Sequence, residues 1–218
     1  QSYGSFDTRK HSFEAGTGSF LQNKFSIMAR YSIIKSDGYI DRATSDLQSY
    51  NITALFKTEK TKLKFLAFGG KEKTYQSWNG VDENTYKINR KFNSSGAIYQ
   101  GANIVKFYDN ETDNYQQNHY HLILNQNISN HWDLETTLHY TKGKGFYENY
   151  KQDQRPDKYN IFNSGIVKTD LIRKKWLDND FYGMVAHIYG KYNQLKINIG
   201  GAGNQYHGKH FGNMSSAF

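Results

Sequence analysis

The chain has 218 residues, a formal net charge of +8 and no cysteine, and 37% of its residues are hydrophobic while 16% are aromatic. The aromatic content excludes a disordered chain, and the lack of cysteine excludes disulfides, zinc–thiolate sites and thiol catalysis. No apolar run approaches the ~18 residues that a membrane-spanning helix needs. The lysines are scattered, with 173–175 the longest basic run, so we expect solvated loops and a polar wall, and no nucleic-acid partner.

Alternation of apolar and polar residues predicts an all-β chain, an antiparallel meander of about eight strands. In chain order the strands are centred near residues 5–15, 24–36, 48–58, 62–73, 116–128, 132–146, 178–190 and 194–207. In the sixth predicted strand, Trp132 and Tyr140 lie at the two ends of an apolar face. They lie about 27 Å apart along the strand, or roughly 20 Å in height at a tilt of about 40°. Terminal aromatics favour a bilayer-spanning strand, although a half-buried strand of a soluble sandwich also alternates.

The connections between these strands sort by length. Tight connections at 21–23, 58–61, 129–131 and 191–194 alternate with long ones at 36–47, 74–115 and 146–177. All the turns should therefore lie at one end of the sheet and all the loops at the other. Short turns at one end and long loops at the other are typical of outer-membrane barrels.

The pleat assigns two sets of residues to opposite faces, because side chains of a strand alternate. We expect one set to face lipid: Tyr50, Ile52, Phe56, Trp132, Leu134, Leu138 and Tyr140. We expect the other set to face the lumen: Asn51, Thr53, Asp133, Glu135 and His139. A one-residue slip would place charge in hydrocarbon, at a cost of about 2–4 kcal/mol for a midplane Lys or Arg.

Three groups of polar residues are candidates for a chemical site. His119 and His121 stand two apart on one strand face, but no third ligand is identifiable nearby, so hydrated lumenal residues are the better interpretation. The acidic segment 109–114 begins like a calcium loop, yet lacks the glycine and the bidentate glutamate of that motif. Asp133, Glu135 and His139 run down a strand rather than meet at a rim. We therefore expect no catalytic residue, no metal site and no cofactor.

Aromatic and amide residues crowd the long loops, and four rings flank the points where loops leave the strands. They are Tyr75, Trp78, Tyr147 and Tyr150. Such rings suit contact with a sugar, a chelate or a macrocycle, and they suit packing of loops on each other equally well. An outer aromatic girdle that touches only headgroups is a third interpretation.

Four stretches carry a resemblance to a known family. They are YSIIKSDGYIDR at 31–42 with SDL at 45–47, GKEKTYQSWNGV at 70–81, HYTKGKGFYE at 139–148 and DFYG at 180–183. In these stretches the chain resembles the barrel of TonB-dependent outer-membrane receptors. The resemblance implies a transmembrane barrel of about 22 strands, an amino-terminal plug domain, and energised import of a ferric siderophore, haem or cobalamin.

No plug and no TonB-contacting segment are visible in the sequence, and about eight strands cannot close a barrel of that size. We therefore expect residues 1–218 to be a partial barrel domain, an internal section of a receptor wall in the cell outer membrane. Its expected partners are the lipid bilayer, the rest of the receptor with its plug, TonB through that plug, and a small-molecule nutrient. Two alternatives stay open: a complete small outer-membrane barrel with a structural or adhesin role, and a soluble carbohydrate-binding β-sandwich.

Overall fold

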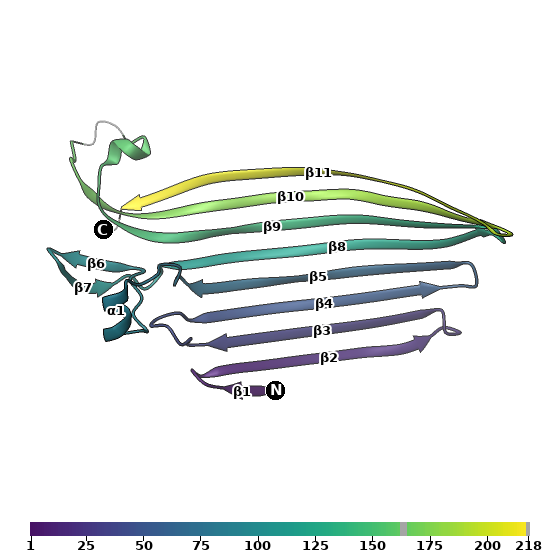
Figure 1. Ribbon diagram of the computed structural model, residues 1–218, viewed down its shortest axis with the longest axis horizontal. Coiled ribbons are helices and arrows are strands. Elements are labelled where there is room, and N and C mark those ends of the chain that lie inside the picture. The colour runs from purple at the N-terminus through teal and green to yellow at the C-terminus, as the bar shows by residue number, and fades with distance from the viewer. Residues whose placement is uncertain (162–164, 217–218) are drawn as a thin grey trace.

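The computed structural model describes residues 1–161 and 165–216, most of which belong to one antiparallel β-sheet (Figure 1). The nine strands lie in the order β1-β2-β3-β4-β5-β8-β9-β10-β11. Within the described residues, β1 and β11 each pair on one side only, so the sheet is not closed. The strands are β1 (Ser2–Gly4), β2 (Thr8–Phe20), β3 (Phe25–Ser36), β4 (Ser45–Lys57), β5 (Thr61–Tyr75), β8 (Thr112–Ser129), β9 (Trp132–Gln154), β10 (Thr169–Tyr192) and β11 (Leu195–Ser216).

The segment between β5 and β8 leaves the sheet. It contains α1 (Glu83–Ile88) and a separate hairpin of β6 (Ala97–Gln100) and β7 (Asn103–Phe107). The Asp82 carboxylate accepts hydrogen bonds from two backbone N–H groups at the start of α1, as an N-cap does. A 3₁₀ helix, η1 (Pro156–Tyr159), lies between β9 and β10. No helix in the described part of the chain is long and apolar enough to cross a membrane.

The connections are sorted as predicted. The tight turns between β2 and β3, β4 and β5, β8 and β9, and β10 and β11 all lie at the right-hand end in Figure 1. The longer connections between β3 and β4, β5 and β8, and β9 and β10 gather at the left-hand end. We call these the turn end and the loop end. The alternation of short and long connections is therefore confirmed from β2 to β11, whereas the short turn between β1 and β2 also lies at the loop end and is an exception.

All eight predicted strands are present, and three extend eight or nine residues further toward the loop end than the alternation indicated. β9 runs to Gln154, β10 begins at Thr169 and β11 reaches Ser216, whereas the pattern had placed these ends at 146, 178 and 207. Charged side chains fall on both faces there, so the alternation fades while the backbone keeps pairing. Arg173, for example, lies opposite Asn149.

The predicted start of the first strand is wrong. Phe6 and Asp7 have φ of 60° and 51°, so the chain turns there and divides β1 from β2. The left-handed conformation is uncommon for residues other than glycine, and for Phe6 the sequence gives no signal of it. β2 then continues to Phe20, beyond the predicted limit at 15.

Residues that lie directly opposite one another in an antiparallel pair share a face. Tyr140 lies opposite Tyr120 and Tyr182, and Tyr120 lies opposite Ala67, which lies opposite Ile52. We call this the apolar face. It carries the odd-numbered residues of β3, β5 and β11 and the even-numbered residues of β4, β8, β9 and β10. The alternate residues form the polar face.

The apolar face has an aromatic margin at each end and no charged strand residue between them, among the residues described. The loop-end margin consists of Tyr31, Tyr50, Tyr120, Tyr140 and Tyr182, and we call it the tyrosine row. The turn-end margin consists of Phe20, Phe25, Phe56, Trp132 and Tyr192. No second layer covers this band in the described structure, and Met184 and Leu138 are 48% and 47% exposed. A contiguous open apolar surface of this kind indicates a partner or a membrane.

Candidate ligand-binding site

Several surface hollows lie on the polar face. Five of them are lined mainly by residues of that face. One, of about 830 Å³, lies at the loop end across β5, β8, β9, β10 and β11, with η1 beside it. We call it the loop-end hollow. It is the strongest candidate for a ligand site in this part of the molecule.

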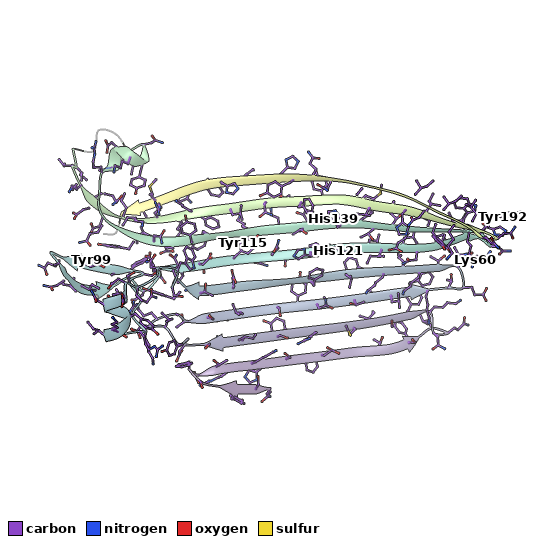
Figure 2. The ribbon with its side chains drawn as sticks, viewed as in Figure 1. Lys60, Tyr99, Tyr115, His121, His139 and Tyr192 are labelled. Carbon is purple, nitrogen blue, oxygen red and sulfur yellow. The ribbon has the colours of Figure 1, made fainter. Side chains whose placement is uncertain are left out.

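Rings from five elements line the loop-end hollow: Tyr115 of β8, Phe146 and Tyr147 of β9, Tyr159 of η1, Trp176 of β10, and His210 and Phe211 of β11. Figure 2 shows Tyr115 in the loop-end half of the sheet. The Tyr115 ring lies over two glycines of β9. A Cβ on Gly143 would come within 2.3 Å of the Tyr115 hydroxyl, and a Cβ on Gly145 within 2.7 Å of the ring. The Gly143-x-Gly145 spacing therefore makes room for an aromatic side chain in the floor of the hollow.

Charges of opposite sign line opposite sides of the hollow. Glu72 and Asp113 come from β5 and β8, whereas Arg173 and Lys175 come from β10. No ion pair joins the acidic to the basic side within the described residues. The Arg173 guanidinium donates to Oδ1 of Asn149 at 3.2 Å, and Nζ of Lys175 lies 5.6 Å from the Tyr147 ring centroid. The hollow can thus offer a polar ligand cations at one side, carboxylates at the other and aromatic rings between.

The structure brings two of the four predicted ligand rings, Trp78 and Tyr147, into contact and places the other two elsewhere. Tyr147 lines the hollow, and Trp78 is 60% exposed and meets the Tyr147 ring edge-to-face at 5.6 Å. Tyr150 lies on the apolar face, and its hydroxyl donates to Asp170. Tyr75 is 7% exposed and donates to two backbone carbonyl oxygens, at 3.1 and 2.9 Å. These positions place Tyr75 and Tyr150 in loop packing and leave Tyr147 and Trp78 as ligand candidates.

Sequence reasoning did not find Tyr115, Tyr159, Arg173, Lys175 or His210. The period-two alternation places Gly143 and Gly145 on the same face as Tyr147. Only the pairing of β8 with β9 shows that Tyr115 lies over these glycines. Arg173 and Lys175 were interpreted as part of a scattered basic background. Only the register of β9 with β10 puts Lys175 opposite Tyr147.

A buried polar network holds the base of the long loop between β5 and β8. The Gln76 side-chain amide donates to the backbone carbonyl oxygens of Thr112 and Glu148, at 3.1 and 3.0 Å. Asn149 donates to Oε1 of Gln76 at 2.9 Å and to Oε1 of Glu111 at 2.8 Å. Since each of these groups is buried, an unpaired partner would cost about 1–3 kcal/mol. The network fixes the loop onto β8 and β9 beside the hollow.

Tyr108, at the end of the same loop, donates its hydroxyl to Glu148, which is also paired with Lys174 at 3.2 Å. Burial, and next the hydrogen bond to the Glu148 carboxylate, raise the pKa of Tyr108 well above its ordinary value. The carboxylate therefore keeps the phenol protonated, and the two side chains join the loop to β9. Glu111 lies in the acidic segment 109–114. Its carboxylate accepts hydrogen bonds from the Asn149 side-chain amide and from the backbone N–H of Tyr150.

Histidines form a row across the middle of the polar face. His119 stacks on Phe68 at 4.6 Å, His121 lies 6.4 Å from His139, and His139 lies 4.9 Å from Phe181. Figure 2 shows His121 and His139 on the neighbouring strands β8 and β9. Phe68 is an aromatic residue on the polar face of β5, and its stacking on His119 explains that position. The described residues contain no group of three or more His, Cys, Asp or Glu side chains arranged to hold a metal ion.

The two predicted face sets lie on opposite faces of the sheet. Tyr50, Ile52, Phe56, Trp132, Leu134, Leu138 and Tyr140 belong to the apolar face by register. Asn51, Thr53, Asp133, Glu135 and His139 belong to the polar face. The register does not identify what covers either face, so their assignment to lipid and to lumen stays a prediction.

The fold is an open antiparallel sheet with short connections at one end and long ones at the other, consistent with a section of a β-barrel wall. No protein-family model matches the chain, and no curated protein matches it. Among solved structures, the chain is similar to the ferric-catecholate import receptor Fiu of Escherichia coli K12 in its closed form, with a TM-score of 0.58 and 8% sequence identity. The match covers 95% of this chain and 30% of that receptor. At this identity the likeness concerns the fold.

Proposed function

We propose that this chain is a section of the wall of an outer-membrane receptor of the TonB-dependent type, which imports a scarce small nutrient by energised transport. The observation that carries the proposal is the contrast between the two faces. One face has a charge-free band with aromatic margins, and the other is polar and bears the five hollows described above. A membrane-spanning wall with lipid on one side and a hydrated lumen on the other needs this distribution.

The unpaired edges of the sheet, at β1 and β11, support the proposal that the wall continues beyond these strands. β11 pairs along its length with β10 and has no partner on its other side within the described residues. Unpaired backbone groups are not tolerated in hydrocarbon, so a membrane wall requires further strands beside β11 and β1. We propose that these strands, together with the plug that contacts TonB, belong to the rest of the receptor.

The alternatives receive less support from the geometry. A complete small barrel would be closed, whereas the described sheet is open. A soluble carbohydrate-binding sandwich would pack two sheets around a dry core, whereas the apolar face here is uncovered by a second sheet. We also propose a binding role rather than catalysis, because Asp133, Glu135 and His139 follow the pleat of one strand.

We propose that the nutrient contacts the loop-end hollow, and that Tyr147 and Lys175 are direct contacts. Aromatic stacking contributes about 1–3 kcal/mol per ring by analogy with other aromatic platforms. The nutrient classes in question are ferric siderophores, haem and cobalamins. The mixed charge of the hollow, with Arg173 and Lys175 facing Glu72 and Asp113, selects a polar ligand without identifying one of these classes.

The test uses the complete protein in its native membrane. Cells that depend on it for one nutrient class are assayed for energised uptake and for surface binding, with Tyr147→Ala and Lys175→Gln as variants. Each variant should weaken binding at least tenfold while barrel assembly, followed by heat-modifiable mobility, is unchanged. Tyr99→Ala is the matched control, since that ring lies on the β6–β7 hairpin and does not line the hollow. Unchanged affinity in both hollow variants would exclude the hollow, and an absence of any energy-dependent uptake would refute the transport role.

A further inference from the structure

We propose that the loop-end hollow binds a short linear peptide whose amino and carboxyl ends are both free. The ammonium group of the peptide lies at the acidic side of the hollow, where Glu72 and Asp113 line it. The carboxylate of the peptide lies at the basic side, where Arg173 and Lys175 line it. The inference rests on the proposed import function, and it names a class of ligand that the chelates and cofactors considered above do not include.

The register aligns one acid, one aromatic ring and one base in a single row across three strands. Tyr147 of β9 lies opposite Asp113 of β8 and opposite Lys175 of β10. The three residues share the polar face, because residues directly opposite one another in an antiparallel pair lie on the same face. A ligand that lies across β8, β9 and β10 therefore meets a carboxylate, a ring and an ammonium group in that order.

The length of this row fits a peptide of three residues. Neighbouring strands lie about 4.8 Å apart, so the backbone positions of Asp113 and Lys175 are about 10 Å apart. An extended chain spans about 3.3–3.6 Å per residue, and three residues therefore cover about the same distance. The hollow, of about 830 Å³, is in the size range of sites that enclose a small ligand.

The charged groups on both sides of the hollow are available to a ligand. Neither Glu72 nor Asp113 forms an ion pair in the part of the chain that the structure describes. The same holds for Arg173 and for Lys175, which is exposed.

Arg173 also has an unused hydrogen-bond donor. Its guanidinium donates to Oδ1 of Asn149 at 3.2 Å, while its Nε is buried and has no hydrogen-bond partner. A buried donor without a partner is unfavourable, and guanidinium groups bind carboxylates through two parallel hydrogen bonds. A ligand carboxylate at this side of the hollow therefore supplies an acceptor that the described residues do not.

The two signs of charge favour a zwitterion over other polar ligands. A ligand of one sign is attracted by one side of the hollow and repelled by the other. A neutral sugar uses the rings and leaves the charged groups on both sides without a partner. A free amino acid carries both charges, but its two ends are one residue apart and cannot reach both sides. A peptide of about three residues pairs with both sides at once.

The middle of the row suits a large apolar side chain on the central residue of the peptide. Tyr147 meets the ring of Trp78 edge-to-face at 5.6 Å, and Trp78 is 60% exposed. Aromatic pairs of this geometry accept a further ring at their open faces. The side chain of a central phenylalanine therefore has two rings to pack against while the ends of the peptide reach the charged groups.

The experiment titrates the purified complete protein, in non-ionic detergent at pH 7, with four forms of one tripeptide by isothermal calorimetry. The probes are alanyl-phenylalanyl-alanine with free ends, with an acetylated amino end, with an amidated carboxyl end, and with both ends blocked. Each block should weaken binding about tenfold, since each removes a charge-assisted hydrogen bond. Equal binding of the free and the doubly blocked forms would overturn the proposal. Equal binding of free phenylalanine would overturn the assignment to a peptide.

Two variants test which side binds which end. Asp113→Asn should weaken binding of the free and the amidated peptide about tenfold and leave the acetylated peptide unaffected. Lys175→Gln should weaken binding of the free and the acetylated peptide and leave the amidated peptide unaffected. Glu135→Gln and Lys62→Gln are the matched controls, because these residues line a different hollow near the turn end, and they should bind all four peptides as the unchanged protein does. Equal losses for all four peptides in both hollow variants would overturn the proposed orientation and pairing.

A separate measurement distinguishes failure of this proposal from failure of the proposed function. The complete protein is reconstituted into phosphatidylcholine vesicles without any peptide, and protection of its strands from protease is measured. Insertion together with equal binding of the free and blocked peptides would remove the peptide site and leave the membrane wall standing. Failure to insert would refute the proposed function, on which import of the peptide depends.

Discussion

Arginine at Met184 and arginine at Val185 should have different effects, although the two residues are neighbours on β10. Met184 is 48% exposed and Val185 is 46% exposed in the open sheet. Met184 lies opposite Leu138 on the apolar face, and Val185 lies opposite Thr137 on the polar face. The two residues are thus matched in exposure, chemical type and position along the strand, and they differ in the face they occupy.

The expected loss of folding stability depends on how deep the substituted residue lies in the bilayer. Met184 is two residues from Tyr182, about 5 Å below the tyrosine row at a tilt of about 40°. Arginine on the lipid face costs about 2–4 kcal/mol at the midplane and about 0–1 near the interface, so about 2 kcal/mol is expected for Met184→Arg. Such a change shifts the folding equilibrium roughly thirtyfold. Val185→Arg should cost less than about 0.5 kcal/mol, because it remains in water on a polar wall.

The assay is reversible urea unfolding of the complete protein in phosphatidylcholine vesicles, followed by tryptophan fluorescence. The same pair is then measured in detergent micelles, where a bilayer no longer fixes the depth of each residue. A difference of about 2 kcal/mol between the variants in vesicles supports the assignment of the apolar face to lipid. Equal losses in the two variants, or a larger loss for Val185→Arg, would refute it.

Three further predictions concern the loop end. Gly143→Val should destabilise the barrel by about 1–3 kcal/mol in urea unfolding, because any Cβ there meets the Tyr115 hydroxyl at 2.3 Å. Asn149→Ala should expose the loop between β5 and β8 to limited proteolysis, since it leaves buried partners unpaired at about 1–3 kcal/mol. Protection of the same loop from protease should fall as the pH rises above about 10. The pKa of the Tyr108 hydroxyl is raised while the loop is attached, so this phenol ionises at a lower pH when the loop is detached, and ionisation favours the detached loop. Tyr108→Phe should weaken that pH dependence, and an unchanged pH dependence would count against the contact with Glu148.

The fold could be predicted from the sequence wherever one face of a strand is apolar and the other is polar. Ile52 and Leu138 alternate with polar neighbours, so their strands and faces follow from period two alone. The prediction failed where that contrast is lost. At the loop end of β9 and β10, charged residues occupy both faces and backbone pairing alone sustains the strands.

The candidate site was harder to predict because it is assembled across strands. Tyr115 and Lys175 are 60 positions apart and meet only through the registers of β8 with β9 and of β9 with β10. The exposure of a side chain also cannot be inferred from the period-two pattern. Tyr75 and Trp78 look alike as rings beside a strand end, yet one is buried by the loop that follows it and the other is open. Hydrogen bonds from the Tyr75 hydroxyl to that loop decide the difference.

The most direct test of the membrane-wall account is a cysteine scan along β9 in the complete protein, reconstituted into vesicles. This chain contains no cysteine, so each introduced thiol in it carries the only label. Single cysteines at positions 133 to 139 are labelled with a fluorophore and exposed to a lipid-borne quencher or a water-soluble one. The account predicts a strict period of two, with Leu134 and Leu138 quenched from lipid and Glu135 and His139 from water. Uniform quenching along the strand, or the opposite alternation, would contradict it.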